Sequence, residues 1–211
     1  TVAPLVDSTR NLNTIYPNGH ARMLAPPPRQ TDREHVRAID SPPGWQQIES
    51  GAREAGRPIS RDTFPTTALT TIVVLDEGEA VDSPRVKSEC GAMAMASVHY
   101  AYDQWRNFGH QPPGVYRGIW QAYTELLEQY SEDRRHQRIH AGHNCWVLPE
   151  EEQFLTPEVL TSSAMIGTRD ALLSRLRELE RAGLSQVMIL PNFDTRYAVL
   201  ERVAQDLIGQ I

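Results

Sequence analysis

Extended basic segments, long apolar runs and ligand-spaced cysteines are missing from this sequence, and each absence excludes a class of protein. The net charge is −6, and no run of Lys or Arg is longer than Arg134-Arg135. Such a chain offers little to nucleic acid or to an anionic membrane surface. The longest apolar stretches, such as 187–190, are far shorter than the roughly 20 residues that span a bilayer. We therefore expect no nucleic-acid partner and no membrane partner.

Cysteine is scarce as well, since Cys90 and Cys145 are the only two in the sequence. They form neither a CxxC pair nor a Cys/His ligand set, so we expect free thiols in a reducing compartment. No apolar secretory segment opens the sequence, and together these features predict a cytoplasmic protein. P-loop, Rossmann glycine, GxSxG and zinc patterns are also missing. Their absence argues against nucleotide hydrolysis, Rossmann-type NAD binding, serine hydrolysis and zinc chemistry.

Proline is abundant, and it is unevenly placed. The chain has 15 prolines in 211 residues, and many lie in residues 1–44, including Pro26-Pro27-Pro28 and Pro42-Pro43. Each proline removes a backbone donor and restricts its predecessor, so this stretch can form neither a long helix nor a central strand. We expect residues 1–44 to form an extended arm that wraps a neighbour. Residues 45–211 are long enough to form one well-buried domain.

Residues 66–75 give the strongest strand signal in the first half of the chain. They are rich in β-branched residues, and their end, 72–75, is apolar on both faces, as buried parallel strands are. A short helix is expected before them, from Trp45 to a glycine C-cap at Gly56. After them, apolar stripes predict helices over 83–100 and 115–130. Gly109 and the proline pair at 112–113 break the chain between these two helices.

The last third of the chain alternates strand and helix signals with short connections. Thr156 followed by Pro157 predicts a helix start. A strand is expected over 163–166, and Thr168 is expected to cap the helix after it, which Gly183 ends. A second strand over 186–190 and a final amphipathic helix complete the pattern. This βαβα order is typical of a parallel sheet, and we expect the two strands to be adjacent, with their helices on one outer face.

Five motifs follow one another in this region: Gly142-His143, 148–152, 154–158, Ile166-Gly167-Thr168 and 177–191. In this order they resemble the C-terminal part of luciferase-like oxidoreductases, which depend on a flavin or on deazaflavin (F420). A weaker resemblance extends upstream through 53–58 and 76–80. Full (β/α)8 barrels need about 250 residues. The resemblance therefore implies an α/β fold in which residues 45–211 are the second half of the barrel. We expect a partial or shortened TIM-barrel-like parallel sheet with outer helices.

The resemblance also places the candidate site residues, because the reactive face of a barrel lies at the carboxyl ends of its strands. There, Gly167, Thr168 and Arg169 are expected to bind a phosphate of cofactor or substrate through helix N–H groups and a guanidinium. The alternative is that Gly167 makes a tight turn and Thr168 only caps a helix. His143 is expected near the substrate mouth, where it would position a substrate hydroxyl or act as a catalytic general acid. The alternative is a loop residue packed on Trp146.

Two further groups of side chains have a simpler interpretation. His136 and His140 are spaced i, i+4, but no HExxH-type carboxylate lies between them. We therefore expect a solvated helix face and no metal site. The aromatic side chains could line a flavin-sized pocket, although rings at helical spacing more often fill a core. They are His99, Tyr100, Tyr102, Trp105, Trp120 and Tyr123.

Two functions remain open at this point. The resemblance implies an F420- or FMN-dependent oxidoreductase or monooxygenase that acts on a small organic substrate, with the cofactor carrying the redox chemistry. The shortness of the chain favours a non-catalytic relative, or a subunit that completes the barrel with a partner chain. A half-barrel exposes unpaired strand edges, so we expect a homodimer or an association with another chain.

Overall fold

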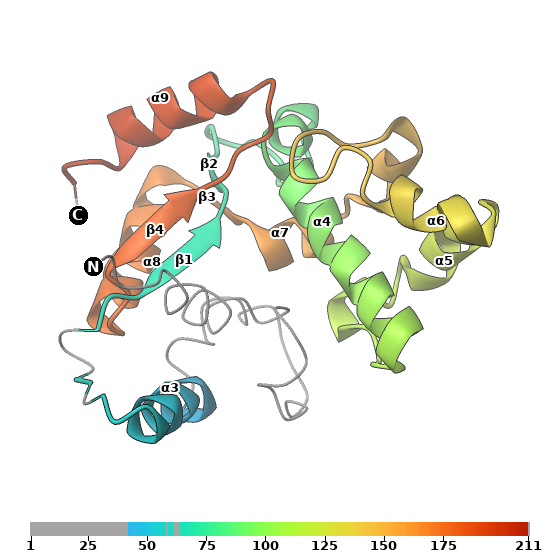
Figure 1. Ribbon diagram of the computed structural model, residues 1–211. Coiled ribbons are helices and arrows are strands. Elements are labelled where there is room, and N and C mark those ends of the chain that lie inside the picture. Colours follow the sequence, from blue (N-terminus) through green and yellow to red (C-terminus); the bar gives the residue numbers. More distant parts are fainter. Residues whose placement is uncertain (1–41, 58, 61–63, 211) are drawn as a thin grey trace, which may run out of the picture.

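The computed structural model contains four short parallel strands in two two-stranded sheets (Figure 1). Two hydrophobic clusters pack against these strands. The structure describes residues 42–57, 59–60 and 64–210. Its strands are β1 (Thr67–Thr70), β2 (Ile72–Val74), β3 (Met165–Gly167) and β4 (Gln186–Ile189). The expected arm over residues 1–44 lies outside the described residues except for its end, which is helical from Pro42. The α/β class with parallel strands and outer helices is confirmed.

Residues 67–74 act as one central strand, because β1 and β2 are separated by Thr71 alone. β4 pairs parallel to β1, with Thr67 beside Gln186, and β3 pairs parallel to β2, with Ile72 beside Met165. The oxygen of Thr70 accepts from the β4 side, whereas that of Thr71 accepts from the β3 side. Successive residues of an extended strand point to opposite edges. β3 and β4 therefore flank the central strand on its two edges.

This strand order corrects the expected adjacency of β3 and β4. Both strands have the expected parallel direction, but the central strand lies between them. A (β/α)8 barrel would place consecutive strands side by side, and the described residues form no closed barrel. The alternation of strand and helix signals correctly predicted that the strands run parallel. It did not fix which strand lies beside which, because side-chain periodicity reports the face of a strand and not its neighbour.

Two helices cover one face of the sheet, as expected. α8 (Arg169–Arg181) follows β3, and α9 (Arg196–Asp206) follows β4. Their apolar side chains pack on Ile72 and Val74 of the central strand, together with Val187 and Ile189 of β4. The packed residues of the two helices are Leu172, Leu173, Leu176, Val199 and Val203. This cluster closes one layer of the molecule.

The opposite face of β2 packs on the long helix α4 (Pro84–Phe108). Val73 contributes to a second cluster with side chains of α4, α5 (Trp120–Glu128) and α7 (Pro157–Ser163). Helix α6 (Glu132–Ile139) and the 3-10 turns η1 (Gly114–Tyr116) and η2 (Pro149–Phe154) complete this half. The remaining helix, α3 (Pro42–Glu54), precedes the sheet and is followed by Gly56 at φ 63°. Among the described helices, none is both long and apolar enough to cross a membrane.

Local signals in the sequence account for most helix ends. The side chains of Ser83, Thr156 and Thr168 each accept a hydrogen bond from the backbone N–H three residues later, as N-caps do. Gly109 ends α4 in the left-handed conformation, at φ 70°, which glycine adopts without steric cost. α4 runs on to Phe108 instead of ending near Tyr100, because no glycine or proline lies between Tyr100 and Gly109.

Two expected elements differ in extent. The single helix expected over 115–130 is divided into η1 and α5, and the backbone of Tyr116 turns toward Pro113 in an i+3 hydrogen bond. The strand expected over 163–166 begins at Met165, because the N–H of Ala164 still bonds the carbonyl of Leu160 at the end of α7.

Candidate functional site

β2 and β3 end together, with Val74 beside Gly167, whereas β4 ends four residues earlier along the central strand, with Ile189 beside Thr70. In open parallel sheets, ligands bind in the crevice outside these ends, where the chain leaves neighbouring strands toward opposite faces. Here the central strand leads to α4 on one face and β4 leads to α9 on the other. The segments that follow the strand ends are 75–83, 168–170 and 190–195. These segments form the candidate site.

The predicted anion-binding residues lie at the end of β3. Thr168 is the N-cap of α8 and accepts from the N–H of Ala171 at 3.4 Å. The first backbone N–H groups of a helix have no partner within the helix, and the helix dipole favours an anion there. The side chain of Arg169 is 45% exposed and donates to Asp170 at 3.2 Å and to Gln210 at 3.1 Å. Arg169 can therefore reach a ligand, although the carboxylate of Asp170 competes for it.

A charged network that the sequence analysis missed closes the end of β2. Arg85 donates to the carbonyl of Val74 at 3.0 Å, to both oxygens of Glu89 at 2.9 and 3.1 Å, and to Glu79. The hydrogen bond from Arg85 lowers the pKa of Glu79 to about 2. Burial raises the pKa of Glu89 above its ordinary value, against the opposing effect of Arg85. The i, i+4 spacing of Arg85 and Glu89 on an expected helix was the signal that could have revealed this pair.

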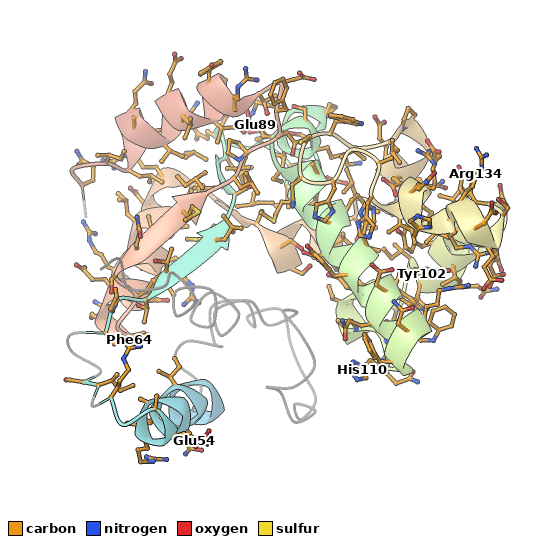
Figure 2. All side chains as sticks on the ribbon, viewed as in Figure 1. Glu54, Phe64, Glu89, Tyr102, His110 and Arg134 are labelled. Carbon is orange, nitrogen blue, oxygen red and sulfur yellow. The ribbon has the colours of Figure 1, made fainter. Side chains whose placement is uncertain are left out.

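The loop after β4 is bound to the middle of α4. The N–H of Asn192 donates to the carbonyl of Glu89 at 3.2 Å, and its side-chain oxygen accepts from the N–H of Ala92 at 3.1 Å. Thr195 donates to the carbonyl of Ser88 at 3.1 Å. Figure 2 shows Glu89 on the part of α4 that faces this loop. The loop therefore has a fixed position at the candidate edge, since both ends of it are tied to one helix.

His143 lies in the turn after α6, and this turn borders the same loop. Gly142 and Asn144 have φ values of 73° and 57°, and the N–H of Phe193 donates to the carbonyl of Cys145 at 2.8 Å. His143 Nε2 lies 3.4 Å from the hydroxyl of Tyr100. Burial is the largest cause that lowers the pKa of His143, followed by the nearby imidazoles of His99 and His140. A neutral imidazole in this position can accept a proton near the strand ends.

A buried hydrogen bond between a histidine and a carboxylate lies next to His143, and no pattern in the sequence predicts it. His99 Nε2 of α4 lies 2.9 Å from a carboxylate oxygen of Glu151 in η2, and both side chains are 3% exposed. The ring of His99 stacks on Tyr123 at 6.3 Å between ring centroids. The two partners are 52 residues apart in the sequence. No local pattern connects residues at that separation.

The structure does not bring the two predicted parts of the site together. The neighbours of His143 come from α4 and the end of α6, whereas Arg169 bonds Asp170 and Gln210. His140 lies 3.3 Å from Asp103, and in the described part of the chain no three acidic, His or Cys side chains are placed to hold a metal ion. Both thiols are free, with Cys90 buried.

The side chains of the expected aromatic group pack against one another. Trp105 lies edge-on to Trp120 at 6.0 Å between ring centroids, and Tyr102 is edge-on to Tyr123 at 6.1 Å. Tyr102 and Tyr123 are fully buried, and Figure 2 shows Tyr102 on the half of α4 beside α5 and α6. These rings belong to the hydrophobic core and do not line an open pocket.

Comparisons of the chain with protein-family models, with curated proteins and with solved structures found no match. The resemblance to luciferase-like oxidoreductases stays a prediction. The geometry supplies the shared carboxyl end of β2 and β3, the exposed guanidinium of Arg169 and the half-buried His143.

Proposed function

We propose that this chain is part of an oxidoreductase of the luciferase-like group that uses F420 or FMN on a small organic substrate. The observation that carries the proposal is the shared carboxyl end of β2 and β3, where the N-terminus of α8 begins. Cofactor sites of parallel α/β folds lie at this edge. The partial (β/α)8 barrel that the resemblance implies needs a different strand order. Barrels and open sheets share this binding edge, however, so the proposed site does not depend on closure.

The residues at the end of β3 fit the anionic part of either cofactor. Gly167, Thr168 and Arg169 would hold a phosphate through the first N–H groups of α8 and the exposed guanidinium. The bound cofactor would supply the hydride or oxygen chemistry. His143 would act on the substrate as a general acid, since the lowered pKa of its ring makes the protonated form a stronger proton donor.

A titration of the protein with F420 and with FMN tests the proposal. Arg169→Ala should weaken binding by about 1.5–3 kcal/mol, the range for hydrogen bonds to charged groups. The melting temperature of the unliganded protein should barely change, because Arg169 makes exposed contacts only. Arg175→Ala is the matched control, since Arg175 is an exposed arginine further along α8 that pairs with Glu178. If the parent and the Arg169 variant bind the cofactors with equal affinity, Arg169 is not part of the binding site.

The second candidate function is a non-catalytic relative or subunit that binds a partner chain. The outer edges of β3 and β4 have no strand partner among the described residues, and Met188 of β4 is 48% exposed. Absorbance spectra of the purified protein separate the two candidates, because an enzyme of this group should retain or take up a flavin or deazaflavin. If neither cofactor binds the parent protein, the partner-binding function is favoured.

A further inference from the structure

Five buried polar atoms in one part of the molecule have no hydrogen-bond partner. They are Nδ1 of His99, the hydroxyls of Tyr102 and Tyr123, Nδ1 of His143 and Oδ1 of Asn144. Buried polar groups are nearly always hydrogen-bonded, and an unpaired one costs about 1–3 kcal/mol. Five such atoms together indicate that a polar molecule binds between them.

Four of these five residues have rings that lie next to one another. The ring of His99 lies 6.3 Å from that of His143 and 6.3 Å from that of Tyr123, measured between centroids. Tyr123 in turn lies 6.1 Å from Tyr102. The side chain of His99 is 3% exposed and Tyr123 is fully buried. Two imidazoles whose centroids lie this far apart are too distant for a direct hydrogen bond, but one small molecule can bridge them.

We propose that His99 and Glu151 are positioning residues for His143, and that the three side chains form one proton-binding unit bridged by a water-sized polar molecule. The inference rests on the proposed role of His143 as a general acid. His99 offers Nε2 to Glu151 and keeps Nδ1 for the bridge. A histidine that donates from one ring nitrogen to a carboxylate has its other nitrogen fixed as an acceptor while the ring is neutral. The orientation of His99 therefore determines which tautomer of His143 the bridge favours.

Charge couples the members of the unit. A protonated His99 repels a second proton on His143, and this repulsion contributes to the lowered pKa of His143. Other groups also face His143: Tyr100 and Asp103 of α4, and His140 at the end of α6. Tyr123 of α5 packs on His99. Asp103 acts in the opposite direction and raises the pKa of His143. Because His99 and Glu151 are shielded from solvent, the unit exchanges protons with solvent on the side of His143 and Tyr100.

The test is a pH titration of the full chain, followed by the nitrogen and carbon NMR signals of each histidine ring. Strongly interacting groups lose their protons in steps that belong to the pair. In the parent protein we expect the His143 curve to have a second inflection at the midpoint of the His99 curve. In Glu151→Gln, the hydrogen bond that holds His99 loses its charged acceptor, and the midpoint of the His143 curve should shift by about one unit. His110→Gln is the control, because His110 lies beyond the end of α4 and outside this unit. It should leave the His143 curve unchanged.

A single-step His143 curve in the parent that is also unmoved in Glu151→Gln would overturn the inference. If Glu151→Gln does not fold, the parent curve alone decides, because independent histidines titrate in one step each. The outcome does not depend on cofactor binding. If the histidines titrate as a coupled pair but neither F420 nor FMN binds, the proton-binding unit is supported and the proposed enzyme function is rejected. If a cofactor binds but the histidines titrate independently, the enzyme function is supported and the proton-binding unit is rejected.

Discussion

Glu79 and Glu89 respond to pH in opposite directions, although both carboxylates bind Arg85. The pKa of Glu79 is lowered to about 2, so the folded state prefers its ionised form. That contribution to stability is present above the ordinary pKa of 4.5 and is lost as the pH falls from there toward about 2. The pKa of Glu89 is raised by burial. Its ionised form therefore opposes folding once the pH rises past the ordinary value.

Glutamine substitutions separate the two effects. Glu79→Gln should be less stable than the parent near neutral pH, and the difference should shrink as the pH falls from about 4.5 to about 2. Glu89→Gln should change relative to the parent with the opposite slope, because glutamine removes a carboxylate whose ionisation burial disfavours. Urea midpoints measured at a series of pH values report both slopes. Slopes of the same sign for the two variants would contradict this description of the network.

At the scale of elements, the close approach of α4 to the segment around η2 depends on a glycine. A Cβ at Gly91 would lie 2.8 Å from a methyl carbon of Leu155 and 2.9 Å from one of Val147. Gly91→Ala should therefore destabilise the protein by about 1–3 kcal/mol through overpacking. Gly51→Ala is the control within α3, where a Cβ would meet no atom within 4 Å. It should gain about 0.5–1 kcal/mol of helix stability.

Thermal unfolding followed by circular dichroism measures both glycine variants. A Gly91 variant that melts at or above the parent temperature would mean that Leu155 and Val147 move aside at no cost. α4 would then not depend on a close approach at this position.

Local residue patterns predicted where most helices and strands end, but they did not predict which elements pack against one another. Thr156, Thr168, Gly109 and Gly183 each mark a boundary close to where the structure has it, since caps act within a few residues. The position of β4 beyond the central strand depends on packing between segments more than 100 residues apart. The same holds for the candidate site. His143 was found as a polar residue in a loop, whereas the His99 and Glu151 pair depends on two helical segments meeting in space.

At the scale of the whole molecule, the open strand edges predict self-association. β4 has no partner on its outer edge in the part of the chain that the structure describes, and exposed edges promote pairing between chains. We expect a dimer in sedimentation velocity. Met188→Lys should shift the dimer toward monomer, because a lysine on an edge strand opposes pairing. Phe108→Lys is the control, since Phe108 is 60% exposed at the far end of α4. If the parent protein sediments as a compact monomer, the prediction that exposed strand edges require a partner chain is wrong.

The central strand also has a consequence for synthesis on the ribosome. Thr70 bonds Ser163, 93 residues later, and Thr67 bonds Gln186, 119 residues later. At elongation rates of about 5–20 residues per second, the strand waits roughly 5–20 seconds for its first neighbour. During that time Val73 can pack on α4, but Ile72 and Val74 lack α8 and α9, on which they pack, and both backbone edges are free. The nascent chain therefore exposes a short apolar strand, which chaperones or other chains can bind before β3 and β4 are synthesised.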